Sequence, residues 1–314
     1  MRRIKFITII IVITIILVSA RQARAQGLSL SLSPPLLEVM IKPGKSITQV
    51  YKITNEGDPV VVTAKVGEFT EDGIKIDQEP APSVSEGFVP EKWISLLNTD
   101  ISFNRPFMLN AKEERQLIVR ISPPKETAEK DYYRAIQFST SPNPPSESSQ
   151  TSVTENIGSP ILITITSSGF MARGAQITQF QLPRIIDSFD ALISDIYIKN
   201  TGNTFFHPVG KVTLTGPIGR GSFAIVPHVI LTGQTKKLLT EDSLSFGDTN
   251  SLKLPGFFLG KYKLELDFTL DEGTIRVNQS KNFYAIPWKA GMILIIGVIG
   301  VIWVMRILKK RRNR

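Results

Sequence analysis

The side chains that could build a metal or catalytic site are few. The sequence of 314 residues has no cysteine and two histidines, His207 and His228, each beside a proline in a different predicted strand-end segment. A zinc site needs clustered ligands, and the nucleophile of an α/β-hydrolase lies in a Gly-x-Ser-x-Gly motif that this sequence lacks. The sequence therefore predicts no catalytic residue, no metal site and no cofactor.

Acidic residues gather in TEDGIKID at 70–77, where Glu71, Asp72 and Asp77 suggest calcium ligands. The full EF-hand pattern is absent and no terminal bidentate glutamate follows at the required spacing, so a turn flanked by solvated acids is the favoured interpretation. Paired carboxylates for glycoside hydrolysis are recognised by their separation in space. An exported hydrolase therefore stays open as a less favoured alternative.

A third polar cluster lies in YKITNEGDPVVV at 51–62, between two short apolar runs. The runs predict two strands, with Tyr51, Ile53, Val60 and Val62 facing a core. We predict that Asn55–Asp58 is a hairpin turn rather than an acidic site. Asn and Gly tolerate the positive φ that a tight turn needs.

The elements that carry these residues are predicted to be strands. In KYKLELDFTL at 261–270, apolar and polar residues alternate, which is typical of a strand with one buried face. Less regular runs occur at 46–54, 59–69, 114–122, 132–138, 160–167, 175–182, 192–199, 209–215 and 275–284. Gly, Pro and Asn turns separate them. This pattern predicts an all-β ectodomain of two tandem Ig-like antiparallel β-sandwiches.

The two sandwiches are predicted to be diverged copies, because IYIKNTGN at 196–203 echoes the Asn-x-Gly turn at 55–58. In each copy a proline precedes a tyrosine by seven to ten residues, which makes Tyr133 and Tyr262 candidates for a tyrosine corner. The predicted boundaries are 26–167 and 175–286, with a linker at 168–174. Ser33-Pro34-Pro35 indicates a strand that lies at an edge or changes sheet. The Pro- and Ser-rich segment 139–159 predicts a loop.

The two ends of the chain predict its topology. Residues 1–25 have a basic start, an apolar run at 6–18 and Ala23-Arg24-Ala25, which together indicate a cleaved signal peptide. Residues 287–308 predict a transmembrane helix with Trp288 and Trp303 near its ends, followed by a basic tail at 309–314. The positive-inside rule places the C-terminus in the cytoplasm and residues 26 to about 287 outside.

The formal charge of +9 also comes from the two ends. They hold 12 of the 37 basic residues and none of the 28 acidic ones, so the middle carries 25 basic against 28 acidic residues, a net charge of −3. This distribution argues against a nucleic-acid partner.

The stretch PPLLEVMIKPGKSITQVYKITNEGDPVVVTAKVGEFTEDG at 34–73 resembles the start of the first ectodomain of WxL-interacting bacterial surface proteins. That family is also similar in its order of signal peptide, two Ig-like domains, one span and a basic tail. The resemblance implies a first domain associated with peptidoglycan and a second domain that contacts other proteins. It transfers architecture but no binding residue. The first domain also resembles the strand plan of pilus chaperones, which are soluble periplasmic proteins without such a span.

The sequence therefore predicts a non-enzymatic, single-pass bacterial protein of the cell membrane and cell surface. Its ectodomain is predicted to bind a cell-wall polymer such as peptidoglycan, or a partner protein, in an adhesion or scaffold role. The alternative is a membrane-tethered assembly chaperone that acts by β-strand addition. A long unpaired edge strand facing a groove would favour that alternative, and a covered edge would argue against it.

Overall fold

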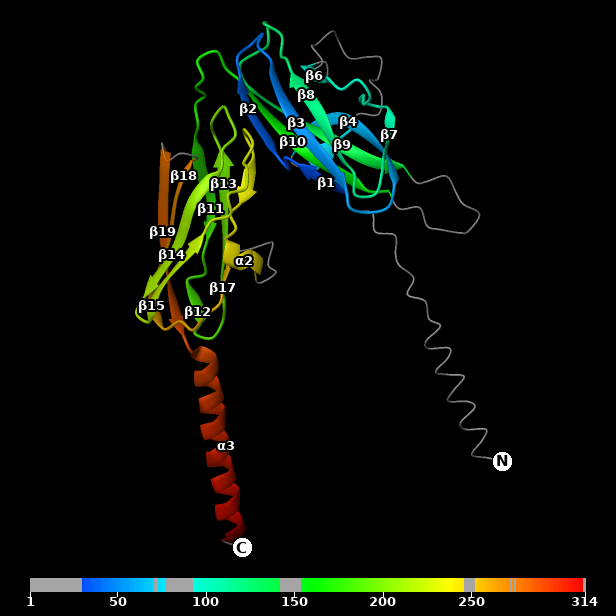
Figure 1. Cartoon of the computed structure of the whole chain (residues 1–314). Helices are drawn as coiled ribbons and strands as arrows, with labels where there is room; N and C mark the ends of the chain where they lie inside the picture. Colours follow the sequence, from blue (N-terminus) through cyan, green and yellow to red (C-terminus); the bar gives the residue numbers. More distant parts are fainter. Residues whose placement is uncertain are drawn as a thin grey trace, which may run out of the picture. The chain divides into compact units, whose positions relative to one another are not determined.

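The structure is a computed structural model. It describes residues 30–70, 73–76, 93–141, 154–245, 252–270, 273 and 275–312. The predicted signal peptide and the acidic residues Glu71, Asp72 and Asp77 lie outside these residues. The described chain is mostly strand with one long apolar helix at its end, which confirms the predicted all-β ectodomain (Figure 1). It divides into two compact units, one of residues up to Thr127 with Tyr132–Ile163 and one of Ala128–Asp131 with Thr164 onward.

The first unit contains two sheets. One sheet has the order β1 (Leu30–Ser33), β3 (Ile47–Asn55), β8 (Glu114–Ile121) and β6 (Ile94–Leu96). The other has the order β2 (Leu37–Ile41), β10 (Asn156–Ile165), β9 (Asp131–Ser141), β4 (Val60–Thr70) and β5 (Gly73–Lys75), and β7 (Pro106–Leu109) also pairs with β4.

The second unit also contains two sheets. One has the order β11 (Ala175–Gln181), β13 (Leu192–Asn200) and β16 (Thr235–Lys237), and β17 (Leu252–Leu254) also pairs with β13. The other has the order β12 (Ile185–Asp187), β19 (Ile275–Ile286), β18 (Gly260–Leu270), β14 (Pro208–Gly216) and β15 (Gly219–Ala224). The short helix α2 (Glu241–Ser245) precedes β17.

The larger sheets of the two units have the same strand plan. The order β2-β10-β9-β4-β5 matches β12-β19-β18-β14-β15 position by position, and the chain visits the strands in the same sequence. In both units the strand before the Asn-x-Gly turn, β3 or β13, belongs to the other sheet. This match supports the duplication inferred from the two turns.

Each unit starts with a strand that changes sheet at a proline. β1 pairs with β3 and β2 joins β10, and Pro34 and Pro35 lie between β1 and β2. β11 pairs with β13 and β12 joins β19, and Pro183 lies between β11 and β12. Proline cannot donate a ladder hydrogen bond, so it ends pairing in one sheet and allows the chain to cross to the other. The sheet change predicted for Ser33-Pro34-Pro35 is confirmed.

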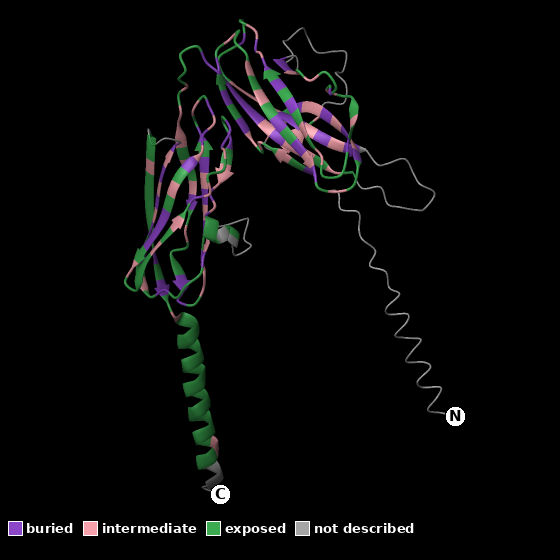
Figure 2. Cartoon of the chain, in the orientation of Figure 1, coloured by how far each residue is buried: buried purple, intermediate pink, exposed green. Residues whose placement is uncertain are grey.

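Alternating apolar side chains on the strands build the core of the second unit. On β18, Tyr262, Leu264, Leu266, Phe268 and Leu270 are at most 3% exposed, as the alternation predicted (Figure 2). They share one buried cluster with Leu192, Ile196 and Ile198 of β13, so the two sheets of this unit face a common core. Burial of such side chains stabilises each by about 1.5–3 kcal/mol relative to exposure.

The sequence predictions need three corrections here. The strand pairs are not all antiparallel, because β12 runs parallel to β19, with Ile185 opposite Tyr284 and Asp187 opposite Ile286. Asn55–Asp58 is not a hairpin turn, because β3 and β4 pair in different sheets and the turn connects the two sheets. The loop predicted at 139–159 is wrong at both ends, because β9 continues to Ser141 and β10 begins at Asn156, and residues 142–153 lie outside the described residues.

The helix α3 (Trp288–Arg312) follows Pro287 directly after β19. Its 22-residue segment Trp288–Lys309 contains an unburied apolar stretch of 18 residues, so it is long and apolar enough to cross a membrane. Pro287 and the end of β19 set its start, since proline is favoured at the beginning of a helix.

Candidate binding surfaces

Asn55 is a buried anchor rather than a binding residue. Its side chain is fully buried, and its Nδ2 donates to the backbone oxygens of Asp58 at 2.7 Å, Leu109 at 3.2 Å and Asn110 at 3.1 Å. Its Oδ1 accepts the Gly57 N–H at 2.9 Å. The side chain thus closes its own turn and fixes the segment between β7 and β8. The neighbouring Tyr51, Ile53, Val60 and Val62 are buried as predicted.

Asn200 plays the same part in the second unit. Its side chain is 1% exposed, and its Nδ2 donates to the carbonyls of Thr204 at 2.9 Å and Ile230 at 3.0 Å. Its Oδ1 accepts the Gly202 N–H at 2.9 Å. Asn is chosen because one amide group supplies both the donor and the acceptor that this corner requires.

The glycine of the first turn lacks the positive φ predicted for it, and the glycine of the second turn allows close packing. Neither Gly57 nor Gly202 has a positive φ. At Gly202, a Cβ atom would lie 2.6 Å from the Gly174 nitrogen and 2.7 Å from the Ala172 oxygen. The Asn203 N–H donates to that Ala172 oxygen at 2.7 Å. Glycine is therefore needed so that the segment entering the second unit can pack closely against the turn.

The tyrosine-corner candidates differ in their environment. Tyr262 is 3% exposed, and its ring stacks on Phe283 with the ring centroids 5.4 Å apart. Its hydroxyl accepts the N–H of Leu259, three residues upstream, at 3.5 Å, as in a tyrosine corner. Tyr133 is half-buried. The fully buried tyrosine of the first unit is Tyr51, whose burial raises its pKa to about 12 while the Ser159 side chain opposes that rise.

The two histidines lie close to one another without forming a metal site. His207 Nδ1 is 3.0 Å from the oxygen of Pro227, the residue before His228. Partial burial and the nearby Lys236 ammonium lower the pKa of His228. Within the described parts of the chain, no group of three or more His, Cys, Asp or Glu side chains could hold a metal ion.

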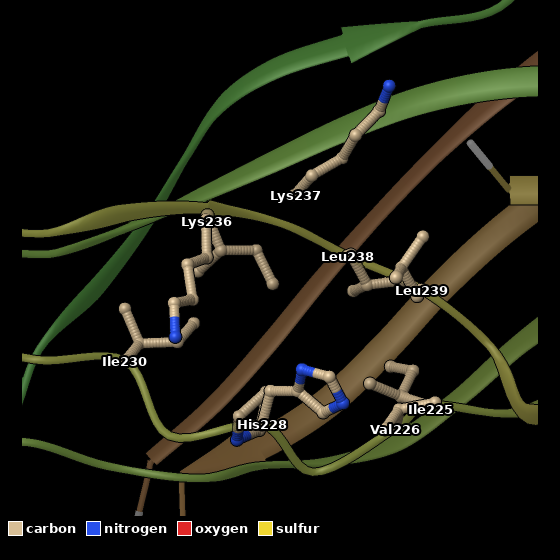
Figure 3. Close-up of a pocket in the computed structure, with 10 residues that line it drawn as sticks. Ile225, Val226, His228, Ile230, Lys236, Lys237, Leu238 and Leu239 are labelled. Carbon is tan, nitrogen blue, oxygen red and sulfur yellow. The ribbon is translucent and has the colours of Figure 1, made fainter. Parts of the chain in front are cut away.

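The hollow beside His228 is too small for a ligand. Its cavity measures about 10 Å³, the space for about one water molecule, and it is lined by Ile225, Val226, Ile230 and Leu238 among others. Figure 3 shows Lys236 and Lys237, neighbours on β16, pointing to opposite sides of the strand. Lys236 Nζ donates to the Val229 carbonyl at 2.9 Å, so it serves the local backbone.

A wider hollow of about 720 Å³ lies over β14 and β18. Gly210 lines it, and a Cβ atom there would lie 2.2 Å from the Asp267 oxygen, so the two strands approach closely at this point. The exposed Arg276 pairs with Asp267 in the same hollow and lowers the pKa of that carboxyl. Lys211 also lines the hollow, so the Arg276–Asp267 pair and this lysine are its charged side chains.

The outer face of sheet β1-β3-β8-β6 carries an aliphatic row. Val50 on β3 lies opposite Ile118 on β8, and the Leu97 N–H donates to the Ile118 carbonyl at 2.8 Å. The three side chains are 41%, 36% and 47% exposed. Directly opposite residues on neighbouring strands share a face, so Val50, Ile118 and Leu97 form one apolar row, the aliphatic row, across three strands.

The free sheet edges of the two units differ in kind. β19 pairs with β12 only at Tyr284–Ile286, so among the described strands its outer edge is unpaired from Ile275 to Phe283. Lys281 points to the core side of that edge, donates to the Phe180 carbonyl at 2.5 Å and covers the Phe180 ring at 5.4 Å. An inward lysine protects an edge from strand addition.

The outer edge of β2 carries no such protection. Its inward residues Leu37, Val39 and Ile41 are all aliphatic and 7–8% exposed, and β10 is its single described neighbour. The strand is five residues long, with prolines shortly before and after it. Short length and flanking prolines limit but do not abolish pairing at this edge.

Asp187 fixes the start of α3. Its carboxylate accepts the Lys289 N–H at 2.9 Å and the Phe189 N–H at 3.0 Å, and the side chain is 1% exposed. Burial alone would raise the pKa of Asp187, but these backbone donors outweigh burial and lower it. Lys289 Nζ also donates to Asp190 at 2.5 and 2.7 Å. The helix start is therefore tied to the loop after β12.

No protein-family model matches the chain, and no curated protein sequence matches it. The chain is similar to solved structures that include the Salmonella enterica SafA pilin in complex with the SafB chaperone (13% identity, TM-score 0.38, 81% of this chain and 97% of that chain). It is also similar to the E. coli chaperone DraB (14% identity, TM-score 0.36, 82% of this chain and 96% of that chain). A third similar structure is the CsuC–CsuE chaperone–tip adhesion subunit complex of Acinetobacter baumannii (11% identity, TM-score 0.36, 82% of this chain and 99% of that chain).

Proposed function

We propose that this chain is a non-enzymatic, membrane-attached protein of the cell surface with two Ig-like units, and that its first unit binds an exported partner protein. The helix α3 would be its single span, with the basic end of the chain in the cytoplasm. The observation that carries the proposal is the aliphatic row of Val50, Ile118 and Leu97, exposed on the outer face of a sheet.

The chemistry of this face favours a protein over a cell-wall polymer. Aliphatic side chains on a flat sheet gain by burial against another apolar surface, which a protein supplies. Polar residues such as Lys52, Gln116 and Arg120 surround the row at the same face, as in an apolar interface centre with a polar rim. The described exposed aromatic side chains lie outside this face, and a peptidoglycan ligand is therefore the less favoured partner.

The test is capture by the full chain reconstituted in nanodiscs. The unmodified chain is expected to retain an exported protein from envelope fractions, and the triple variant V50S/L97S/I118S is expected to lose it. Val209→Ser, at a 50% exposed position of the second unit, is the matched control and should retain capture. Purified peptidoglycan is offered in parallel. Retention of peptidoglycan that the triple variant leaves unchanged would contradict the proposal.

A second candidate function, an assembly chaperone acting by β-strand addition, is favoured by the edge of β2. The inward side chains of β2 are all aliphatic, so a strand added at its outer edge would meet no charged side chain on the core side. Hydrogen exchange separates the two modes. Strand addition would slow exchange along 37–41 in the captured complex, whereas binding at the aliphatic row would leave β2 exchange unchanged and protect the face of β3 and β8.

A further inference from the structure

A patch of exposed apolar side chains surrounds the start of α3. Phe189 is 65% exposed and Phe257 is 48% exposed, and their ring centroids lie 5.1 Å apart. Leu259, Ile286 and Trp288 are 44–49% exposed. We call these five residues the basal patch. Figure 1 shows β12, the β14–β15 turn and the start of α3 at the same end of the second unit.

Hydrogen bonds hold the basal patch in place beside the helix. The Phe189 N–H donates to Asp187, whose carboxylate also accepts the Lys289 N–H. The Phe258 N–H donates to the Ser188 carbonyl at 3.0 Å, and the Ser188 N–H donates to the Ile286 carbonyl at 3.2 Å. Both phenylalanine rings therefore come from segments tied to the residues at which α3 begins.

The rings are not side chains left over from the core. Phe258 and Phe283 already fill the core at this end and are 5% and 0% exposed. Phe189 and Phe257 contact each other on the outside of that layer. Two adjacent phenylalanines held in water lose apolar burial, so their position indicates that another apolar medium covers them.

We propose that the basal patch lies in the interfacial layer of the bilayer that α3 crosses, so that the second unit rests on the membrane surface. The inference rests on the proposed membrane attachment. The apolar segment of α3 begins at Trp288, and the Asp187 carboxylate accepts the N–H groups of both Lys289 and Phe189, so Phe189 lies beside the start of the span. Aromatic side chains at that depth are favoured at the membrane–water interface.

The test uses the absence of cysteine, which permits labelling at a single introduced thiol. Leu259→Cys places a nitroxide in the basal patch and keeps both phenylalanines. Ser280→Cys, opposite Glu265 on β19, reports from an exposed strand position, and Ile296→Cys reports from within α3. The full chain is reconstituted in nanodiscs of phosphatidylcholine and phosphatidylglycerol. Collisions of the label with oxygen and with a water-soluble nickel chelate then give its depth.

The oxygen-to-nickel collision ratio is expected to be highest at position 296, intermediate at 259 and lowest at 280. The double substitution F189S/F257S should lower the ratio at 259 to the value at 280, and V209S should leave it unchanged. Equal collision ratios at positions 259 and 280, together with a high ratio at 296, would overturn the inference about the basal patch. The same result would still support α3 as a membrane span. An aqueous ratio at 296 would overturn the membrane attachment itself. Spin–spin broadening at position 259, together with a low oxygen-to-nickel collision ratio, would show that a second copy of the chain covers the basal patch. This result would also overturn the inference.

Discussion

Asn55 and Asn200 occupy matching turns, yet each fixes a different neighbour. Asn55 reaches the carbonyls of Leu109 and Asn110 before β8, whereas Asn200 reaches Ile230 before β16, and the Asn200 turn also receives the segment 172–174. The corner is thus a property of the shared strand plan, because crossing between sheets leaves buried carbonyls to which the asparagine amide donates. The segments that pack around the two corners have diverged.

The two units diverge further at their surfaces. The first has an aliphatic row and an edge at β2 without an inward charge, and the second has an inward Lys281 on its free edge and aromatic residues around the start of α3. The same plan can therefore present one unit to a partner and the other to a membrane. The predictions below test which features belong to the plan and which to one unit.

The largest expected effect is from removal of either corner amide. Asn55→Ala and Asn200→Ala should each destabilise their own unit by about 3 kcal/mol, because each removes one donor from several buried carbonyls and the acceptor of a turn glycine N–H. Asn55→Ala should cost more, since three carbonyls are affected instead of two. Hydrogen exchange of the full chain under mild denaturant reads each unit separately. Asn98→Ala removes the bonds to the Gln116 carbonyl and from the Ile118 N–H at an exposed site and is the control. An equal loss of stability in this control would refute the anchor role.

Adding a Cβ atom at Gly202 should destabilise the second unit and leave the first unit unchanged. Gly202→Ala would push against backbone atoms of residues 172–174 and should destabilise the second unit by about 2 kcal/mol. Exchange should accelerate at 172–174 and 200–203 first. Gly297→Ala, which meets nothing within 4 Å, is the matched control. Unchanged exchange at 172–174 would show that the close packing is not needed.

The buried tyrosine of the first unit should make stability depend on alkaline pH. The pKa of Tyr51 is about 12 when folded and 10.0 as a free side chain, so the unfolded chain ionises first. Stability is fully present below pH 10 and is lost as pH rises toward 12, by about 1.4 kcal/mol at pH 11. Tyr51→Phe should remove this loss in denaturant titrations at pH 8 and 11. Tyr284→Phe, at an exposed site, is the control; an unchanged slope in Tyr51→Phe would contradict the assignment.

The smallest effect is expected at the surface pair of the second unit. Arg276→Ala should barely change the unfolding midpoint, because exposed ion pairs contribute little. The pKa of Asp267 should rise toward its ordinary value of 3.8, measurable by NMR titration of the carboxyl. A depressed carboxyl pKa adds stability that is present above that value and lost as pH falls, so the variant should lose this acid dependence. A large midpoint shift at neutral pH would contradict the minor role.

Much of the fold could be predicted from local pattern. All ten predicted strand runs are strands, because each carries enough alternation to mark a buried face. The short strands β5, β6, β7, β12, β15, β16 and β17 were missed, since three to six residues show too little periodicity. The parallel pairing of β12 was missed because pairing partners depend on contacts far apart in sequence.

The surfaces could not be predicted in the same way. Val50, Leu97 and Ile118 each resemble ordinary strand residues, and only the register between strands shows that they share one face. Phe189 and Phe257 are likewise 68 residues apart in the chain (257 − 189) and become neighbours through the fold. The Asn-x-Gly turns were recognised as a repeat, but the buried role of their amides depends on carbonyls supplied by other segments.

The pairing of β19 has a mechanical consequence. A pull through α3 would act along β19, which is paired with β18 at eleven positions and with β12 at three. Such a pull loads these backbone hydrogen bonds side by side, in shear, instead of opening them one after another. A chain that joins a membrane to an external partner would bear tension through this ladder.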